Sequence, residues 1–163
     1  MPGCGKTTVA RILSKLTGRL WFDSDKELEK QADMCINDIF ALRGEQYFRQ
    51  LETKTLKRLL DRDGIILSTG GGAVLKNSGL LHDNSDVVYI YRSIDSIMET
   101  INTDTRPLLK DRESLERLFK QREALYENAC HIKVENRLDL ETLCWDIISK
   151  LHIQSKIQGG FNT

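Results

Sequence analysis

The sequence predicts an α/β fold in which helices cover both faces of a parallel sheet. Two observations point to this class. Short runs such as residues 65–67 and 87–91 are continuously apolar, as strands buried on both faces are, rather than alternating between apolar and polar residues. Stretches with helical spacing of apolar residues separate these runs, which is the order of elements in a layered α/β domain.

The elements follow one another along the whole chain. A first helix is predicted over residues 6–16 because Val9, Leu13 and Leu16 share one helical face, and Gly18 can end it. A strand over 20–22 and a helix over 26–32 follow, with Ser24 or Asp25 as the helix cap. The remaining predictions are helices over 36–42 and 45–62, strands over 65–67 and 87–91, a helix over 94–101, a helix over 113–128, a strand over 131–134 and a helix over 138–151.

Composition excludes several classes of protein. Lys+Arg and Asp+Glu total 24 each, so the formal net charge of zero disfavours a nucleic-acid partner. No apolar run approaches the roughly 20 residues that span a membrane, and the four scattered cysteines predict neither a disulfide framework nor a zinc site. We expect a cytoplasmic protein with no membrane partner, one domain over residues 1–151 and a polar tail over 152–163.

The first residues match most of the phosphate-binding loop pattern GxxxxGK[ST]. Its lysine is Lys6 and its hydroxyl residue is Thr7, while the first glycine of the pattern would lie just before Met1. Glycines let backbone N–H groups face a polyphosphate, and the helix that begins near Lys6 adds its positive end. The sequence thus predicts an ATP site over Gly3, Cys4, Gly5, Lys6, Thr7 and Thr8.

A buried strand normally precedes such a loop, and the sequence has no residues for it. We therefore expect Met1 to be an internal methionine of a longer protein, so that this chain is truncated within the loop and lacks the first strand of its sheet.

Five later segments, in this order, closely resemble shikimate kinases. They are Phe22–Asp25, Gly44–Glu52, Ser68–Ala73, Arg106–Leu109 and Arg122–Tyr126. The resemblance covers nearly the whole chain. It implies a fold like that of the nucleoside monophosphate kinases, a three-layer α/β/α arrangement with parallel strand order 2-3-1-4-5, of which the first strand is missing here. It also implies transfer of the γ-phosphoryl group of MgATP to the 3-hydroxyl of shikimate, on the route to aromatic amino acids, by a monomer.

The resemblance also implies roles for individual residues. Thr7 and Asp23 would hold Mg²⁺, and Asp25 would contact the hydroxyls of shikimate. Arg49 and Arg122 would bind its carboxylate, since guanidinium groups suit a planar anion. The glycine turn Gly70, Gly71 and Gly72 would line the same pocket.

Arg106 is expected in a lid over about residues 102–113, where it would reach the transferring phosphoryl group as a catalytic residue with Lys6 and Asp25. Arg137 is expected near the adenine. The chain departs from the family pattern at Glu99 and Thr100, where an arginine commonly packs on that base.

Two other functions remain open on the sequence alone. One is a related kinase for gluconate or another small hydroxy acid. The other is a catalytically dead, shikimate kinase-like binding protein. Outside the resemblance, each arginine is equally consistent with a surface residue, and the two aspartates with a solvated turn or a helix cap.

Overall fold

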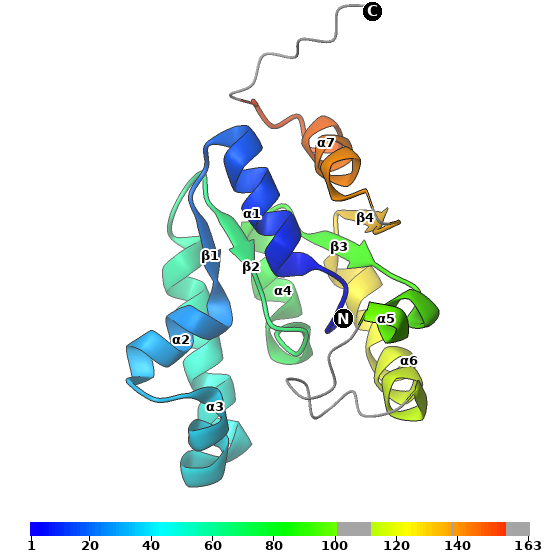
Figure 1. The fold of residues 1–163 in the computed structure, drawn as a ribbon. Helices are drawn as coiled ribbons and strands as arrows, with labels where there is room; N and C mark the ends of the chain where they lie inside the picture. The colour runs from blue at the N-terminus through cyan, green and yellow to red at the C-terminus, as the bar shows by residue number, and fades with distance from the viewer. Residues whose placement is uncertain (101–111, 138, 156–163) are drawn as a thin grey trace, which may run out of the picture.

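The computed structural model describes residues 1–100, 112–137 and 139–155 (Figure 1). Its helices are α1 (Lys6–Thr17), α2 (Ser24–Ala32), α3 (Ile36–Leu60), α4 (Val74–Asn84), α5 (Ile94–Thr100), α6 (Arg112–Ala129) and α7 (Leu140–Lys150). Its strands are β1 (Trp21–Asp23), β2 (Ile66–Ser68), β3 (Val88–Tyr91) and β4 (Ile132–Glu135).

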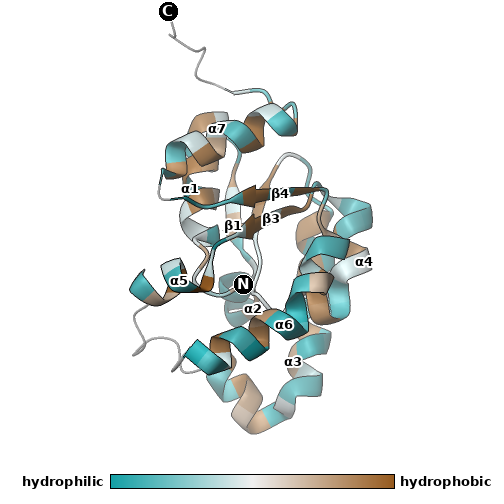
Figure 2. Ribbon diagram, turned by 90° about the vertical axis from the view of Figure 1, so that its right-hand side faces the viewer, coloured by the Kyte–Doolittle hydropathy of each residue, from teal (hydrophilic) through white to brown (hydrophobic). Residues whose placement is uncertain are grey.

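The four strands form two parallel pairs. Trp21 lies opposite Ile66 in the pair β1–β2, and Val88 lies opposite Ile132 in the pair β3–β4. The expected order 2-3-1-4-5 gives these same pairs when its first strand is left out, because β1 to β4 then correspond to strands 2 to 5. Helices α1 and α7 lie on one side of the strands and α4 and α6 on the other (Figure 2), which confirms the layered α/β fold.

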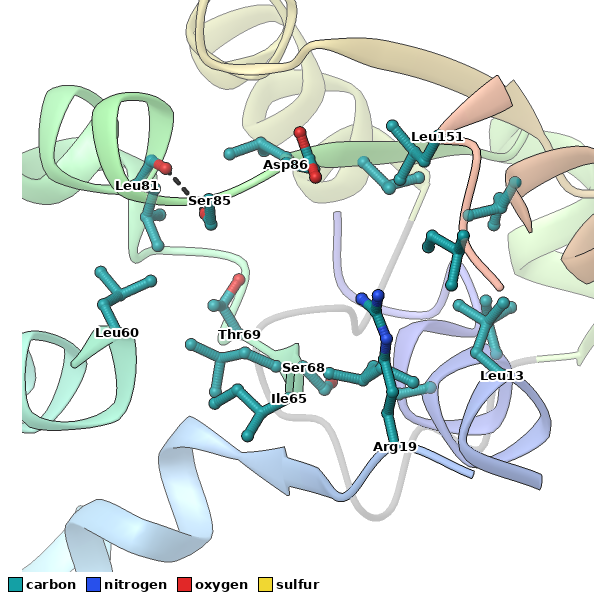
Figure 3. A pocket seen from close by; sticks show the side chains of 18 of the residues that line it. Leu13, Arg19, Leu60, Ile65, Ser68, Thr69, Leu81, Ser85, Asp86 and Leu151 are labelled. Atoms are coloured by element: carbon teal, nitrogen blue, oxygen red, sulfur yellow. Dashed lines mark hydrogen bonds between the residues drawn. The ribbon is translucent and has the colours of Figure 1, made fainter. Parts of the chain in front are cut away.

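A cavity of about 320 Å³ separates the two strand pairs. Ile66 and Ser68 of β2 line one side and Val88 and Ile90 of β3 the other, and α1 and α7 contribute Leu13 and Ile147. Figure 3 shows this cavity with Leu13 and Leu151 on one wall and Leu60 on another.

Three local differences from the predicted elements have clear causes. The cap of α2 is Asp23, whose Oδ1 accepts from the N–H groups of Asp25 and Lys26, because the helix begins at Ser24, directly after β1 and two residues earlier than predicted. The two predicted helices at 36–42 and 45–62 join at Gly44, which has φ 77° and ψ 172° and turns the chain between them. Helix α4 was not predicted, since Asn77 and Gly79 weaken its helical propensity.

The core has one main cluster and two smaller ones. Buried residues of α1, β3, β4, α6 and α7 form the main cluster. Leu28, Ile39 and Phe48 join α2 to α3, and Leu56, Ala73 and Leu81 join α3 to α4. Ile153, in the predicted tail, packs against the main cluster, while residues 156–163 lie outside the described ones. No helix of the described part of the chain is long and apolar enough to span a bilayer.

Candidate active site at the carboxyl ends of the strands

The phosphate-loop residues form a tight turn that leads into α1. Gly3 and Gly5 have φ values of 79° and 91°, in the left-handed region that glycine adopts without strain. Gly5 is the N-cap of α1, so the first free N–H groups of this helix face the loop. The Lys6 ammonium donates to the carbonyl oxygen of Met1 at 2.6 Å. The lysine therefore lies folded over its own loop.

Asn136 holds the buried side of this loop, a role that the sequence did not indicate. Asn136, directly after β4, donates through Nδ2 to the carbonyl oxygen of Cys4 at 3.0 Å. A Cβ atom at Gly5 would lie 2.8 Å from the same Nδ2. Cys4 itself is 1% exposed. Cys4 thus faces the protein interior, while the side chains of Thr7 and Thr8 are exposed.

Three side-chain oxygens meet beside Lys6 at the ends of α1, β1 and β2. Thr7 Oγ1 lies 3.3 Å from Asp23 Oδ2 and 3.4 Å from Ser68 Oγ. Hydroxyl and carboxylate oxygens suit Mg²⁺, which is commonly held by few protein ligands together with water and substrate phosphates. The pair Thr7 and Asp23 fits the predicted metal role. Ser68, the first residue of the predicted segment Ser68–Ala73, lies beside Thr7 because the fold brings β2 next to α1.

Asp25 lies against the glycine turn. A Cβ atom at Gly70 would lie 2.7 Å from Asp25 Oδ1, so only glycine leaves room for the carboxylate there. Burial, reinforced by the nearby negative charges of Asp23 and Glu52 and opposed by Lys6, raises the pKa of Asp25 from 3.8 to about 6. A carboxyl with such a pKa can accept or release a proton near neutral pH.

Arg49 points from α3 toward the same turn. Its Nη1 lies 3.0 Å from Glu52 Oε2 and donates to the carbonyl oxygen of Gly72 at 3.4 Å, and its Nη2 lies 3.2 Å from Glu45 Oε1. A Cβ atom at Gly72 would lie 3.1 Å from Arg49 Nη1. The glycine turn therefore lets the guanidinium approach the backbone closely.

Arg122 reaches the turn from the opposite side, on α6. Its Nη1 donates to the carbonyl oxygen of Gly71 at 3.2 Å, and the hydroxyl of Tyr126 donates to the same oxygen at 2.6 Å. Tyr126 ends the predicted segment Arg122–Tyr126, but the sequence did not indicate a role for it. In the structure its hydroxyl helps to hold the Gly71 carbonyl in place. Two arginines from separate helices thus converge on Gly70–Gly72.

Of the remaining predicted residues, one lies away from this group and one lies outside the described residues. Arg137 is 81% exposed at its side chain and pairs with Glu135 at 2.7 Å. Arg106 and most of the expected lid, residues 101–111, lie outside the described residues.

Donor groups lie at two ends of this arrangement. Lys6 and the free N–H groups of α1 form one end, and Arg49 and Arg122 form the other, with Asp25 and the glycine turn between them. This geometry suits a reaction that joins a polyphosphate to a small acidic molecule bearing a hydroxyl group.

Comparisons with known proteins agree with this geometry. The family model described as shikimate kinase matches residues 2–152. A shikimate kinase of Nitrosospira multiformis is 42% identical over 142 residues, which cover 83% of this chain and 73% of the relative. A shikimate kinase of Clostridium botulinum is 35% identical over 150 residues, or 90% of each chain.

Solved structures give the same result. The shikimate kinase of Acinetobacter baumannii, in complex with shikimate, superposes with a TM-score of 0.84 at 36% identity and covers 92% of this chain and 88% of its own. That of Aquifex aeolicus gives 0.79 at 28% identity, covering 93% of this chain and 92% of its own. The motifs, the fold and these relatives agree: the chain belongs to the shikimate kinase family.

Proposed function

We propose that this chain transfers the γ-phosphoryl group of ATP to the 3-hydroxyl of shikimate, giving shikimate 3-phosphate and ADP. The observation that carries the proposal is the convergence of Arg49 and Arg122 on the turn Gly70–Gly72, with Asp25 beside it and the phosphate loop next to Asp25.

The arginine end supplies specificity for a carboxylate. Guanidinium groups offer pairs of parallel N–H donors that match the two oxygens of a carboxylate. Gly70, Gly71 and Gly72 carry no side chains, so a cyclic substrate can lie close to the backbone between Arg49 and Arg122. Asp25, at the same turn, is placed to accept hydrogen bonds from hydroxyl groups of the ring.

The phosphate-loop end binds ATP. Backbone N–H groups from Gly3 to Thr8 would cradle the phosphates, and Lys6 would leave the Met1 carbonyl to contact them. Thr7 and Asp23 would hold Mg²⁺, which neutralises phosphate charge when bound. We also propose that Arg106 contacts the transferred group and Arg137 the adenine side.

Transfer itself needs little covalent chemistry from the protein. The substrate hydroxyl oxygen attacks the γ-phosphorus, the bond to the β-phosphate oxygen breaks, and the hydroxyl proton passes to Asp25 or to solvent. Positioning between two anion sites and charge neutralisation by Lys6 account for most of the acceleration. We also propose that the protein acts as a monomer, as its resemblance to shikimate kinases implies.

The test is ADP release measured with shikimate and with gluconate as acceptors, with and without a chelator of Mg²⁺. We expect release that requires shikimate and stops in the chelator. Release that depends on gluconate would favour the related kinase. A folded protein that binds shikimate but not ATP would favour the binding protein.

A matched pair of arginines on α6 tests the carboxylate site. Arg122→Met should raise the KM for shikimate about 10²-fold, because a charged hydrogen bond contributes roughly 1.5–3 kcal/mol. Arg49 remains as the second donor to the carboxylate. Arg117→Met, on the exposed surface of the same helix, should leave this KM unchanged. Equal effects of the two substitutions would contradict the proposed role of Arg122.

A further inference from the structure

Asn77 is a buried amide behind the substrate end of the site. It lies in α4 and is 1% exposed, and its φ and ψ of −124° and 16° depart from those of a regular helix. Its side chain makes no hydrogen bond to Arg49 or Gly72 themselves. Buried amides are retained where their donors and acceptors are satisfied, so the contacts of Asn77 indicate what it holds in place.

Three partners fix the orientation of this amide. Asn77 Nδ2 lies 3.2 Å from the carbonyl oxygen of Ala73 and 3.4 Å from Glu52 Oε2, both of which can only accept from it. Asn77 Oδ1 accepts from the hydroxyl of Thr53 at 2.6 Å. Reversing the amide would place its oxygen against two acceptors, so only one orientation satisfies all three contacts.

Glu52 links Asn77 to the substrate site. Its side chain is 3% exposed, and the same oxygen, Oε2, accepts from Asn77 and from Arg49 at 3.0 Å. Burial raises the pKa of Glu52, and the hydrogen bond and charge of Arg49 oppose that shift. A buried carboxylate needs several donors, and Asn77 supplies one without adding a positive charge that would compete with Arg49.

The other carboxylate on Arg49 does less to orient it. Glu45 is 67% exposed, and an exposed ion pair on a helix contributes only about 0.3–0.5 kcal/mol. The direction of the guanidinium toward Gly72 therefore depends mainly on Glu52. Asn77 also donates to the carbonyl oxygen of Ala73, directly after the glycine turn. Its amide therefore connects the Glu52–Arg49 pair to the backbone that follows the turn.

We propose that Asn77 is a positioning residue for shikimate binding, which acts through Glu52 to hold Arg49 toward the glycine turn. This inference rests on the proposed function and adds to it a residue that does not touch the substrate. It assigns α4 a role in substrate affinity as well as in packing.

The first test is steady-state kinetics of Asn77→Leu, which keeps the approximate size and removes the amide. We expect the KM for shikimate to rise about tenfold, with kcat and the KM for ATP within twofold. In the Glu52→Gln background the same substitution should add less than twofold, because contacting residues in one network are not additive. Equal changes in both KM values, or a full effect in that background, would overturn the inference.

A second readout does not need activity. NMR signals of the Arg49 guanidinium report how fast its protons exchange with water, and Asn77→Leu should make that exchange several-fold faster. Unchanged exchange would overturn the inference. If the unmodified protein neither binds nor phosphorylates shikimate and the exchange still responds, the proposed function fails while the link from Asn77 to Arg49 stands.

Two controls separate positioning from folding. Thr55→Val removes another buried hydrogen bond on α3, to Gln31 Oε1 at 3.3 Å, and should lower the melting temperature without changing the KM for shikimate. If Asn77→Leu does not fold, Thr53→Val removes the donor to Asn77, together with the contact of this hydroxyl to the Arg49 carbonyl oxygen at 3.0 Å, and should raise that KM, whereas Thr53→Ser, which keeps the hydroxyl, should restore it. In the Glu52→Gln background Thr53→Val should add less than twofold, which separates the path through Asn77 from the contact with the Arg49 backbone. Equal kinetics in Thr53→Val and Thr53→Ser would overturn the inference.

Discussion

At Asp25 the proposed catalytic role and folding stability conflict. Its carboxyl is held close to Gly70 and away from water, with Asp23 and Glu52 nearby, and its pKa rises from 3.8 to about 6. Because the folded state binds this proton more tightly than the unfolded state, the associated stability is complete below about pH 4 and is lost as pH rises through 6.

We therefore expect Asp25→Asn to be more stable and less active than the unmodified protein. At pH 7.5 it should melt about 2–6 °C higher, since 1 kcal/mol shifts Tm by roughly 2–4 °C in a chain of this size. The difference should shrink at pH 5. Phosphoryl transfer should fall by about 10²–10⁴-fold if Asp25 is the base.

The control for this prediction is Asp83→Asn, an exposed change on α4 that should leave Tm and activity unchanged. The activity of the unmodified protein should rise as pH passes through about 6, where Asp25 ionises. A lower Tm for Asp25→Asn at pH 7.5 would contradict the burial argument.

The bend in helix α3 sets the direction of the segment that carries Arg49. The helix bends at Gly44, five residues before Arg49, and the backbone there has φ 77° and ψ 172°. Residues that carry a side chain rarely adopt this backbone conformation, although a Cβ atom at Gly44 would meet nothing within 4 Å. Strain rather than a clash therefore requires glycine at the bend.

We expect Gly44→Ala to destabilise the protein by about 1–3 kcal/mol, the cost of a residue held in a sparsely populated backbone region. It should also weaken shikimate binding, because the segment after the bend carries Arg49. Thermal melting and shikimate titration measure the two effects.

Gly79→Ala is the matched control within α4. A Cβ atom there also meets nothing within 4 Å, but the backbone is not left-handed, so alanine should be neutral or stabilise by up to about 1 kcal/mol. Similar melting temperatures for the two variants would show that strain at Gly44 is negligible.

The whole molecule is organised around the cavity between its strand pairs. The edges of β2 and β3 that face this cavity have no strand partner among the described residues. Nearby, the Tyr89 hydroxyl is buried and has no hydrogen-bond partner within that part of the chain. These unpaired strand edges, and apolar lining residues such as Leu13, Val88 and Ile147, suit one further parallel strand.

A variant in which five apolar β-branched residues and a glycine precede Met1 tests this interpretation. Burying about five such side chains at ~1.5–3 kcal/mol each exceeds the backbone entropy lost on ordering them, at ~1–2 kcal/mol per residue. The glycine completes the phosphate-loop pattern. We expect Tm to rise by at least several degrees.

The control carries the same extension with proline at its central position, which removes a ladder hydrogen bond in the middle of a sheet. It should melt close to the unmodified chain. Equal melting of all three proteins would show that the cavity does not take a strand.

The sequence by itself determined the α/β class, most helix and strand positions, and the order of motifs that places the chain among shikimate kinases. Local signals carry this information: Gly3 to Lys6 for the loop, Gly18 for a helix end, and continuous apolar runs for buried strands. The break between the helices at 36–42 and 45–62 was predicted, and Gly44 lies at it. The cap at Asp23 was missed because it depends on how β1 and α2 meet.

Only the tertiary structure decided which distant residues share the site. Arg49 and Arg122 lie 73 positions apart in the sequence and meet at one turn because α3 and α6 both flank it. Asn77 appeared to be an ordinary polar residue until α4 placed it against Glu52. Burial gives Asn77 its partners and raises the pKa values of Asp25 and Glu52. Burial is a property of the packed chain rather than of local sequence.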